Sequence, residues 1–247
     1  MLFSGSKTRS MIQALVGQGL LALVLSSPGL LPAAHAASAT PLGAAKLADL
    51  RGERASPDVR HIADWAVDSG DPGGLPFVIV DKKDSRVFVF DAAGQLRGAS
   101  PALVGAAHGD DSVPGIGQRA IASIQPQERT TPAGRFSAVM GFGPKGEDIL
   151  WVDYDSAVAL HRVVTHNPQE RRLQRLASKV AAERRITYGC INVPVSFYDD
   201  VVRPTFSGTR GIVYILPESR PAQELFGSYD VRHQVSHASG MTQVSAH

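Results

Sequence analysis

Short runs of β-branched and aromatic residues, separated by turn residues, dominate the chain from residue 75 onward. Two of these runs, Phe77–Val80 and Arg86–Phe90, are joined by a short connection rich in Asp, Lys and Ser. Such runs with short polar connections predict a β-hairpin or meander. The chain is therefore expected to form a mainly β domain. Further short strands are predicted at Leu103–Val104, Arg135–Val139, Leu150–Asp153, Ala157–His161 and Gly211–Leu216.

One stretch, Asn167–Arg184, departs from the β pattern. Asn167 is suited to cap a helix, Pro168 suits the first turn, and Glu170 has capping-box spacing. Apolar residues recur at helical spacing and basic residues fill the other positions. We expect one amphipathic surface helix, whose basic face is either solvated or in contact with an anionic envelope polymer. The apolar positions are Leu173, Leu176, Ala177, Val180 and Ala181, and the basic ones are Arg171, Arg172, Arg175, Lys179 and Arg184.

The first 36 residues have the three-part pattern of a secretory signal peptide. Lys7 and Arg9 precede the apolar stretch Met11–Leu25, and a Pro-Gly break then leads to a small-residue A-H-A sequence ending at Ala36. The alternative is an uncleaved membrane anchor. However, polar and glycine residues interrupt the stretch, which is shorter than the roughly 20 apolar residues that span a membrane. We expect export to the periplasm or cell envelope, with no membrane span left after cleavage.

Composition divides the rest of the chain into three parts. Residues 37–74 are rich in Ala, Gly, Asp and Arg, contain a helical patch around Trp65, and close in a Gly/Pro-rich turn. We interpret them as a leader packed loosely onto the main domain. Residues 75–217 hold the predicted strands and form that domain. Residues 218–247 are polar, and we expect a poorly ordered C-terminal tail.

Net charge does not favour nucleic acid as a partner. The chain has 25 Lys and Arg against 23 Asp and Glu, and the first 36 residues hold two of the basic residues and none of the acidic ones. Removal of that segment leaves 23 of each sign. A net formal charge of zero provides no global attraction to a polyanion.

The sequence contains one cysteine, Cys190, so the chain can form no internal disulfide. It stands in the sequence R-I-T-Y-G-C-I-N-V-P, residues 185–194. A Gly directly before Cys permits a tight turn that presents the thiol and leaves backbone N–H groups free to hold an oxyanion. This local sequence alone is compatible with a buried structural cysteine or with a nucleophile.

Two earlier motifs give this cysteine a context. They are T-P-A-G-R-F at residues 131–136 and the pair Leu160-His161, and T-Y-G-C-I-N at residues 187–192 follows them. In content and order these motifs resemble the catalytic domain of the L,D-transpeptidases. That pattern has a T-P-x-G-x-F segment, a histidine at a strand end, and then S/T-H-G-C, a hydrophobic residue and Asn or Arg. The resemblance covers residues 75–217 and implies a β-sandwich or mixed sheet with one inserted amphipathic helix before the cysteine.

The resemblance also implies a role for each matched residue. Cys190 is the nucleophile and His161 the base. The backbone N–H groups of Tyr188, Gly189 and Cys190 form an oxyanion hole, while Thr187 orients the loop. The implied substrates are the tetrapeptide stems of peptidoglycan, which are cross-linked or remodelled through a cysteine thioester. Neither a cofactor nor a metal ion is implied.

Two features depart from the family pattern. Tyr188 stands where the family usually has a histidine, and the stretch between His161 and Thr187 is longer than usual. Tyr can donate a hydrogen bond but cannot be a cation at neutral pH, so we expect an altered substrate or rate. His166 is a second candidate for the base. Two other functions stay open: a hydrolase of the same fold that trims stems, and a peptidoglycan-binding module without turnover.

Other chemical signals in the sequence are weaker. Gly115–Ala120 has G-x-G-x-x-A spacing but follows no apolar strand, so it predicts a substrate-side loop rather than a dinucleotide site. The remaining histidines lack metal-ligand spacing, and one cysteine provides no thiolate cluster. Arginine presents a planar fork of donors that matches a carboxylate. Candidates for binding stem carboxylates, or else ordinary surface residues, are Arg135, Arg162, Arg185 and Arg210.

Overall fold

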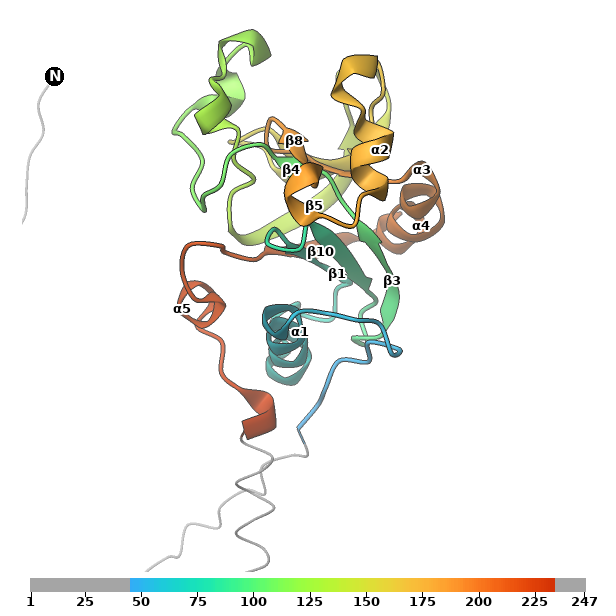
Figure 1. Ribbon diagram of the computed structural model, residues 1–247. Helices are drawn as coiled ribbons and strands as arrows, with labels where there is room; N and C mark the ends of the chain where they lie inside the picture. The colour runs from blue at the N-terminus through green and yellow to red at the C-terminus, as the bar shows by residue number, and fades with distance from the viewer. Residues whose placement is uncertain (1–44, 234–247) are drawn as a thin grey trace, which may run out of the picture. The chain divides into compact units, whose positions relative to one another are not determined.

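The computed structural model describes residues 45–233 and is mainly β (Figure 1). The expected signal peptide, residues 1–36, and the end of the expected tail, residues 234–247, lie outside the described residues. An eight-stranded mixed sheet has the order β3-β2-β1-β10-β5-β6-β7-β9, and β4 and β8 form a second, two-stranded sheet. The expected fold class, mainly β with a large mixed sheet, is confirmed. The strands are β1 Phe77–Asp81, β2 Arg86–Phe90, β3 Leu96–Pro101, β4 Val104–Gly105, β5 Gly134–Phe142, β6 Asp148–Asp153, β7 Val158–Arg162, β8 Arg185–Thr187, β9 Ile191–Val193 and β10 Arg210–Ile215.

The large sheet curls until its two edge strands, β3 and β9, are linked through the chain that follows β3. Leu103 and Asn192 exchange two backbone hydrogen bonds, at 2.8 and 2.9 Å. The enclosed face is apolar, because successive residues of a strand point to opposite faces and the inward positions are apolar, most of them valine, leucine or isoleucine. This closure brings β9, and with it the cysteine directly before the strand, close to the segment that follows β3.

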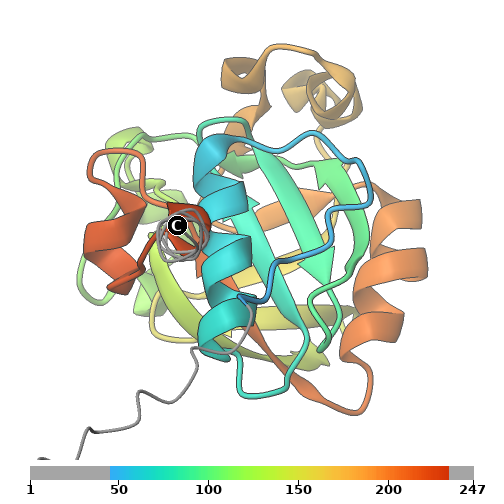
Figure 2. The ribbon, with the colours of Figure 1, turned by 90° about the horizontal axis from the view of Figure 1, so that it is seen from below.

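Helix α1 (Pro57–Ser69) covers the outer face of β1, β2 and β10, as Figure 2 shows for the blue-to-cyan helix. The Ser56 hydroxyl accepts from a backbone N–H in the first turn, and Gly70 ends the helix in the left-handed conformation. Trp65 is buried and packs edge-on against Tyr214 of β10. The expectation of a loosely packed leader is therefore wrong for this helix, whose apolar face completes the second core. The other fully buried residues of α1 are Val59, Ile62, Ala63 and Ala66.

The segment expected to be one amphipathic helix consists instead of three short helices. The predicted cap is confirmed, since the Asn167 side chain accepts from the Gln169 N–H at 3.1 Å. Arg171 adopts the left-handed conformation (φ 50°), which ends the first of them. Ser178 is extended, which ends the second. The helices are η4 Pro168–Glu170, α2 Arg172–Ala177 and η5 Ala181–Arg184.

Tertiary contacts explain why the helical pattern of this segment is not followed. Arg184 is buried, and its guanidinium donates to the carbonyl oxygens of Ser85 (3.2 Å) and Asp84 (2.6 Å) in the turn after β1. Leu173 and Val180 of the expected apolar stripe are exposed. These contacts hold the end of the segment at the turn after β1, so the contacts of the fold override local propensity.

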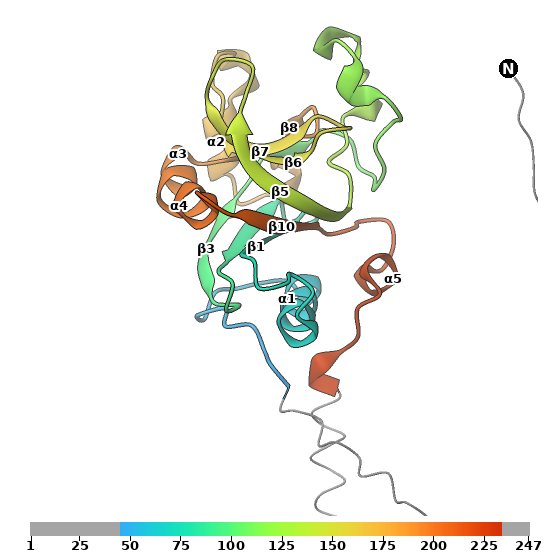
Figure 3. The same cartoon turned by 180° about the vertical axis from the view of Figure 1, so that it is seen from behind.

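A helical segment after β9 was not predicted. It runs through α3 (Val195–Phe197), the π-helical turn η6 (Tyr198–Val202) and α4 (Arg203–Phe206), and it packs against the enclosed core, beside β10 in Figure 3. The expectation of a poorly ordered tail is wrong for residues 218–233. Helix α5 (Ala222–Phe226) and the buried Val231 pack in the same cluster as α1. Within residues 45–233, no helix has both the length and the apolar character needed to cross a membrane.

Candidate active site

Cys190 lies in the tight turn between β8 and β9. Gly189 before it has φ +133°, and a Cβ atom there would lie 2.9 Å from the Thr130 carbonyl oxygen, so the turn requires glycine. The Cys190 thiol is half-buried and donates to the carbonyl oxygen of Ala157 at 3.6 Å. Desolvation raises the pKa of this thiol, while the N–H of Ala159 and the positive charge of Arg172 act in the opposite direction.

His161 lies on β7, the strand that pairs in parallel with β9, and its register partner is Asn192. Its Nδ1 atom is 2.8 Å from the carbonyl oxygen of Arg162, which can only accept, so Nδ1 carries the proton. The Nε2 atom is then unprotonated and has a lone pair that can accept a hydrogen bond or a proton. Desolvation lowers the pKa of His161, against smaller opposing effects of the Arg162 carbonyl and of Glu147. The resting imidazole is therefore neutral.

The strand register brings the two candidate catalytic residues to neighbouring segments of the chain. Cys190 lies in the turn directly before β9, two positions from Asn192, and His161 on β7 is the register partner of Asn192. The Asn192 amide nitrogen is 3.1 Å from His161 Nε2. In the part of the chain that the structure describes, no hydrogen bond joins Cys190 to His161. The structure thus brings Cys190 to the turn before the strand that pairs with β7, with Asn192 in contact with His161.

Two threonines hold the turn that carries the cysteine. The Thr187 hydroxyl donates to the Cys190 carbonyl oxygen at 2.6 Å and accepts from the Gly189 N–H at 3.2 Å. The Thr131 hydroxyl donates to the Gly189 carbonyl oxygen at 2.8 Å and accepts from the Gly105 N–H at 2.8 Å. Of the three N–H groups assigned to an oxyanion hole, that of Gly189 is therefore engaged by Thr187.

Tyr188, two residues before Cys190, is paired with a cation. The Arg129 guanidinium lies over its ring, 4.0 Å from the ring centre. Arg129 is itself anchored to the Ile124 carbonyl oxygen at 3.2 Å. The positive charge that a histidine could provide at this position is thus present beside the ring, on a different side chain. Sequence analysis missed this because the two residues are 59 positions apart.

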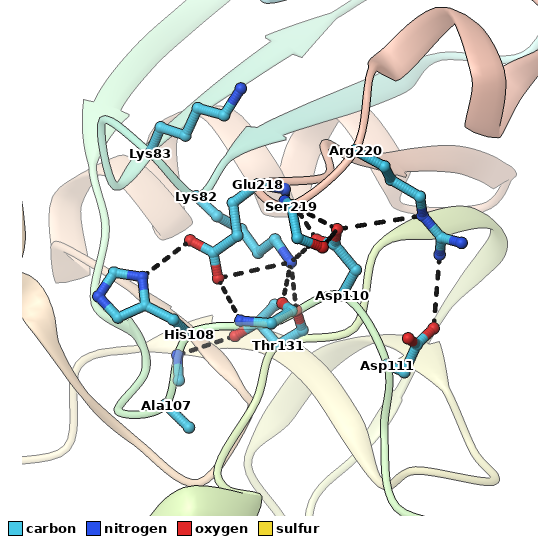
Figure 4. Close-up of polar contacts among 12 residues, drawn as sticks. Lys82, Lys83, Ala107, His108, Asp110, Asp111, Thr131, Glu218, Ser219 and Arg220 are labelled. Atoms are coloured by element: carbon cyan, nitrogen blue, oxygen red, sulfur yellow. Dashed lines mark hydrogen bonds and ion pairs between the residues drawn. The ribbon is translucent and has the colours of Figure 1, made fainter.

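A buried ionic cluster contacts the backbone of Thr131 (Figure 4). The Lys82 ammonium donates to the carbonyl oxygens of Gly109 (2.6 Å) and Thr131 (3.1 Å) and to the Asp110 carboxylate (2.8 Å). Asp110 also accepts from the backbone N–H of Glu218 at 2.8 Å. Burial lowers the pKa of Lys82, and its ion pairs oppose that effect. The cluster ties the turn after β1 to the Thr131 segment and to the chain after β10.

A cavity of about 440 Å³ adjoins the base. The two candidate bases, His161 and His166, both line this cavity. Among the cavities found in the described residues, it is therefore the one that adjoins the candidate site. His166 is exposed and lies in the loop after β7. The remaining lining residues are Lys145, Glu147, Asp148, Arg162, Val163, Val164 and Thr165.

Three of the four arginines considered for substrate carboxylates already bind carboxylates of the protein. Arg135 contacts Asp71 at 2.6 Å, Arg162 contacts Asp148 at 2.8 Å, and Arg185 pairs with Glu218. The structure therefore assigns these three to the fold rather than to substrate.

The remaining weak signals do not assemble into a binding site in the described residues. Gly115 begins a single 3₁₀ turn, and Gly117 packs closely against the Asp155 carbonyl oxygen, without the strand–turn–helix context of a dinucleotide site. Among residues 45–233, no group of three or more His, Cys, Asp or Glu side chains is placed to hold a metal ion.

Fold and site together define a mainly β protein with a single, half-buried cysteine in the turn before β9 and a neutral histidine on the adjacent strand β7. No family model matches the sequence, and no curated protein matches it. Among solved structures, the chain is similar to a cysteine-to-serine mutant of an L,D-transpeptidase from Enterococcus faecium, with 14% identity and a TM-score of 0.30. The match covers 57% of this chain and 50% of the transpeptidase chain.

Proposed function

We propose that the chain is a peptidoglycan L,D-transpeptidase that acts through a Cys190 thioester on tetrapeptide stems. The observation that carries the proposal is that Cys190 directly precedes β9, which pairs with the strand that holds His161, and that His161 Nε2 is unprotonated. The order of the sequence motifs supports the choice of substrate class. Export to the periplasm or cell envelope, proposed from residues 1–36, would place the enzyme with its substrate.

The protonation states favour proton transfer during attack over a preformed ion pair. The pKa of the thiol is raised and the pKa of the imidazole is lowered, so both groups are neutral at rest. Cys190 Sγ then attacks the carbonyl carbon of the amide before the terminal D-alanine, and His161 Nε2 takes the thiol proton. This requires the thiol to leave the Ala157 carbonyl oxygen and the Asn192 NH₂ group to leave His161 Nε2. Catalytic hydrogen bonds often tighten only when substrate binds.

The second half of the reaction returns the proton. The negative charge that develops on the carbonyl oxygen is held by backbone N–H groups of the turn, and the C–N bond breaks as His161 gives its proton to the departing D-alanine amine. An amine of a second stem then attacks the thioester carbonyl and loses a proton to His161. Sγ leaves and is reprotonated, so no oxidant, reductant or metal takes part in this sequence.

The test is mass spectrometry of disaccharide-tetrapeptide incubated with the mature protein. We expect dimers and free D-alanine from the natural sequence, and loss of both for Cys190→Ala and His161→Ala. His166→Ala is the matched control, because His166 lines the same cavity without contacting Asn192, and it should keep activity. Shortened monomers would reassign the protein as a hydrolase. Unchanged substrate under all conditions would contradict the catalytic proposal and favour a binding module.

A further inference from the structure

A continuous chain of hydrogen bonds links the inserted segment to the candidate base. Arg172, the first residue of α2, contacts the Glu170 carboxylate through Nε at 2.5 Å and donates through Nη1 to Asn192 Oδ1 at 2.8 Å. The other end of the Asn192 amide lies 3.1 Å from His161 Nε2. Asn192 is almost fully buried, at 1% exposure, so bulk water does not substitute for these partners. The segment that lengthens the His161-to-Thr187 spacing thus reaches into the site.

The donors and acceptors of this chain allow one arrangement of protons. A guanidinium has only donors, so the Asn192 atom facing Arg172 is the carbonyl oxygen and the atom facing His161 is the NH₂ group. An NH₂ group donates, so His161 Nε2 accepts and carries no proton. Nδ1 must then hold the proton, and it donates to the Arg162 carbonyl oxygen at 2.8 Å. Each bond in the series has the polarity that its neighbours require.

We propose that Arg172 is a positioning residue that fixes His161, through Asn192, as the neutral Nδ1–H tautomer. A proton on Nε2 would face the Asn192 NH₂ group, so two donors would oppose each other. Rotation of the Asn192 amide would relieve that conflict but would turn its NH₂ group toward the Arg172 guanidinium. Arg172 therefore disfavours the imidazolium in the resting protein, and Nε2 takes the thiol proton only once the Asn192 NH₂ group has moved away from it. This inference rests on the proposed function only for the role of His161 as the base.

The charged groups around His161 shift its pKa in both directions. Glu147, on the turn between β5 and β6, raises the pKa of His161, whereas Arg172 lowers it, and desolvation lowers it most. Arg172 acts on Cys190 in the matching sense, lowering the pKa of the thiol. Arg172 thus makes the Cys190 thiol ionise more readily and keeps the His161 imidazole unprotonated. The other titratable or charged groups near the imidazole are Cys190 and the cavity residues Lys145, Asp148, Arg162 and His166.

Nitrogen NMR of the His161 ring tests the inference without substrate. In the mature protein, with signals assigned by their loss in His161→Gln, we expect the Nδ1–H tautomer at neutral pH and a pKa below the ordinary value. In Arg172→Met the Asn192 amide is free to turn, so Nε2–H should become populated. The pKa of His161 should rise by about one unit, a tenfold gain in imidazolium at a given pH.

Arg171→Met is the matched control, because it removes the neighbouring guanidinium, which is exposed and makes no hydrogen bond to Asn192. It should leave the tautomer and pKa unchanged. Identical His161 titrations in Arg172→Met and the natural sequence would overturn the inference, as would equal shifts in both variants, which would indicate a general field effect. If Arg172→Met does not unfold cooperatively, Arg172→Gln, whose shorter side chain falls short of Asn192, replaces it under the same criteria. If His161 shows the Nδ1–H tautomer and its dependence on Arg172 but the protein forms no thioester, the proposed function is refuted and this inference is not.

Discussion

Burial shifts the pKa values of Cys190 and His161, the two groups of the candidate dyad, in opposite directions. It removes water from a thiol and from an imidazole alike, and in both cases it disfavours the charged form. The pKa of Cys190 therefore rises and the pKa of His161 falls, which leaves two neutral partners. The T-Y-G-C motif could be matched from sequence, but this balance could not, because it depends on what the fold packs around each group.

Alkylation of Cys190 by iodoacetamide should therefore be slow at neutral pH. Only the thiolate reacts, and a raised pKa means that the thiolate forms above the ordinary value of about 8.5. The rate constant should rise about tenfold per pH unit up to a midpoint above that value, as measured by mass spectrometry of the labelled protein. In urea the same thiol should show a midpoint near the ordinary value. A midpoint below it in the folded protein would indicate a preformed thiolate–imidazolium pair and contradict the proton-transfer mechanism proposed above.

At the scale of secondary structure, regular patterns were predictable and context-dependent elements were not. All seven expected strands overlap observed ones, because each has the β-branched or aromatic composition of a half-buried strand. The three-residue strands β8 and β9 are too short to carry a pattern, yet they flank the cysteine. The inserted segment has a helical pattern that the contacts of Arg172 and Arg184 interrupt. The strand that carries His161 was therefore predictable, whereas the short strands that flank Cys190 and the inserted segment depend on long-range contacts.

Helix α1 provides a test of which elements belong to the folded domain. Ile62 is fully buried between α1 and the outer face of the sheet, so Ile62→Ala removes apolar contacts and leaves a cavity. We expect a loss of about 2–5 kcal/mol in the free energy of unfolding, measured by urea denaturation. Leu173→Ala on the exposed side of α2 is the control and should change stability by less than about 0.5 kcal/mol. Equal, small effects would mean that residues 57–69 are a loosely packed leader after all.

Across the whole molecule, the buried ionic cluster connects segments that are far apart in the sequence to the turn that carries Cys190. Lys82 donates to the Thr131 carbonyl oxygen, and the hydroxyl of the same threonine holds the Gly189 carbonyl oxygen. Sequence could not identify this lysine, because Lys82 and Lys83 stand side by side in one polar turn. The side chain of Lys82 is 1% exposed and that of Lys83 is 51% exposed. Only the assembled fold distinguishes them.

Lys82→Met should therefore affect both stability and catalysis. The substitution fills a similar volume but leaves the Asp110 carboxylate buried without its cation, and breaking such a pair costs about 3–5 kcal/mol. Loss of the donor to Thr131 should also loosen the Gly189 turn and lower the rate of thioester formation. Lys83→Met removes a surface pair with Asp58 and should cost no more than about 1 kcal/mol, with an unchanged rate.

The double variant Lys82→Met/Asp110→Asn separates charge from packing. It removes the uncompensated carboxylate, so its loss in free energy of unfolding should be smaller than the sum of the two single losses. The Thr131 carbonyl still lacks its donor, and the reduced rate of thioester formation should therefore persist. Urea denaturation and single-turnover mass spectrometry measure the two quantities separately. Recovery of stability together with full recovery of rate would mean that Lys82 does not position the catalytic turn through Thr131.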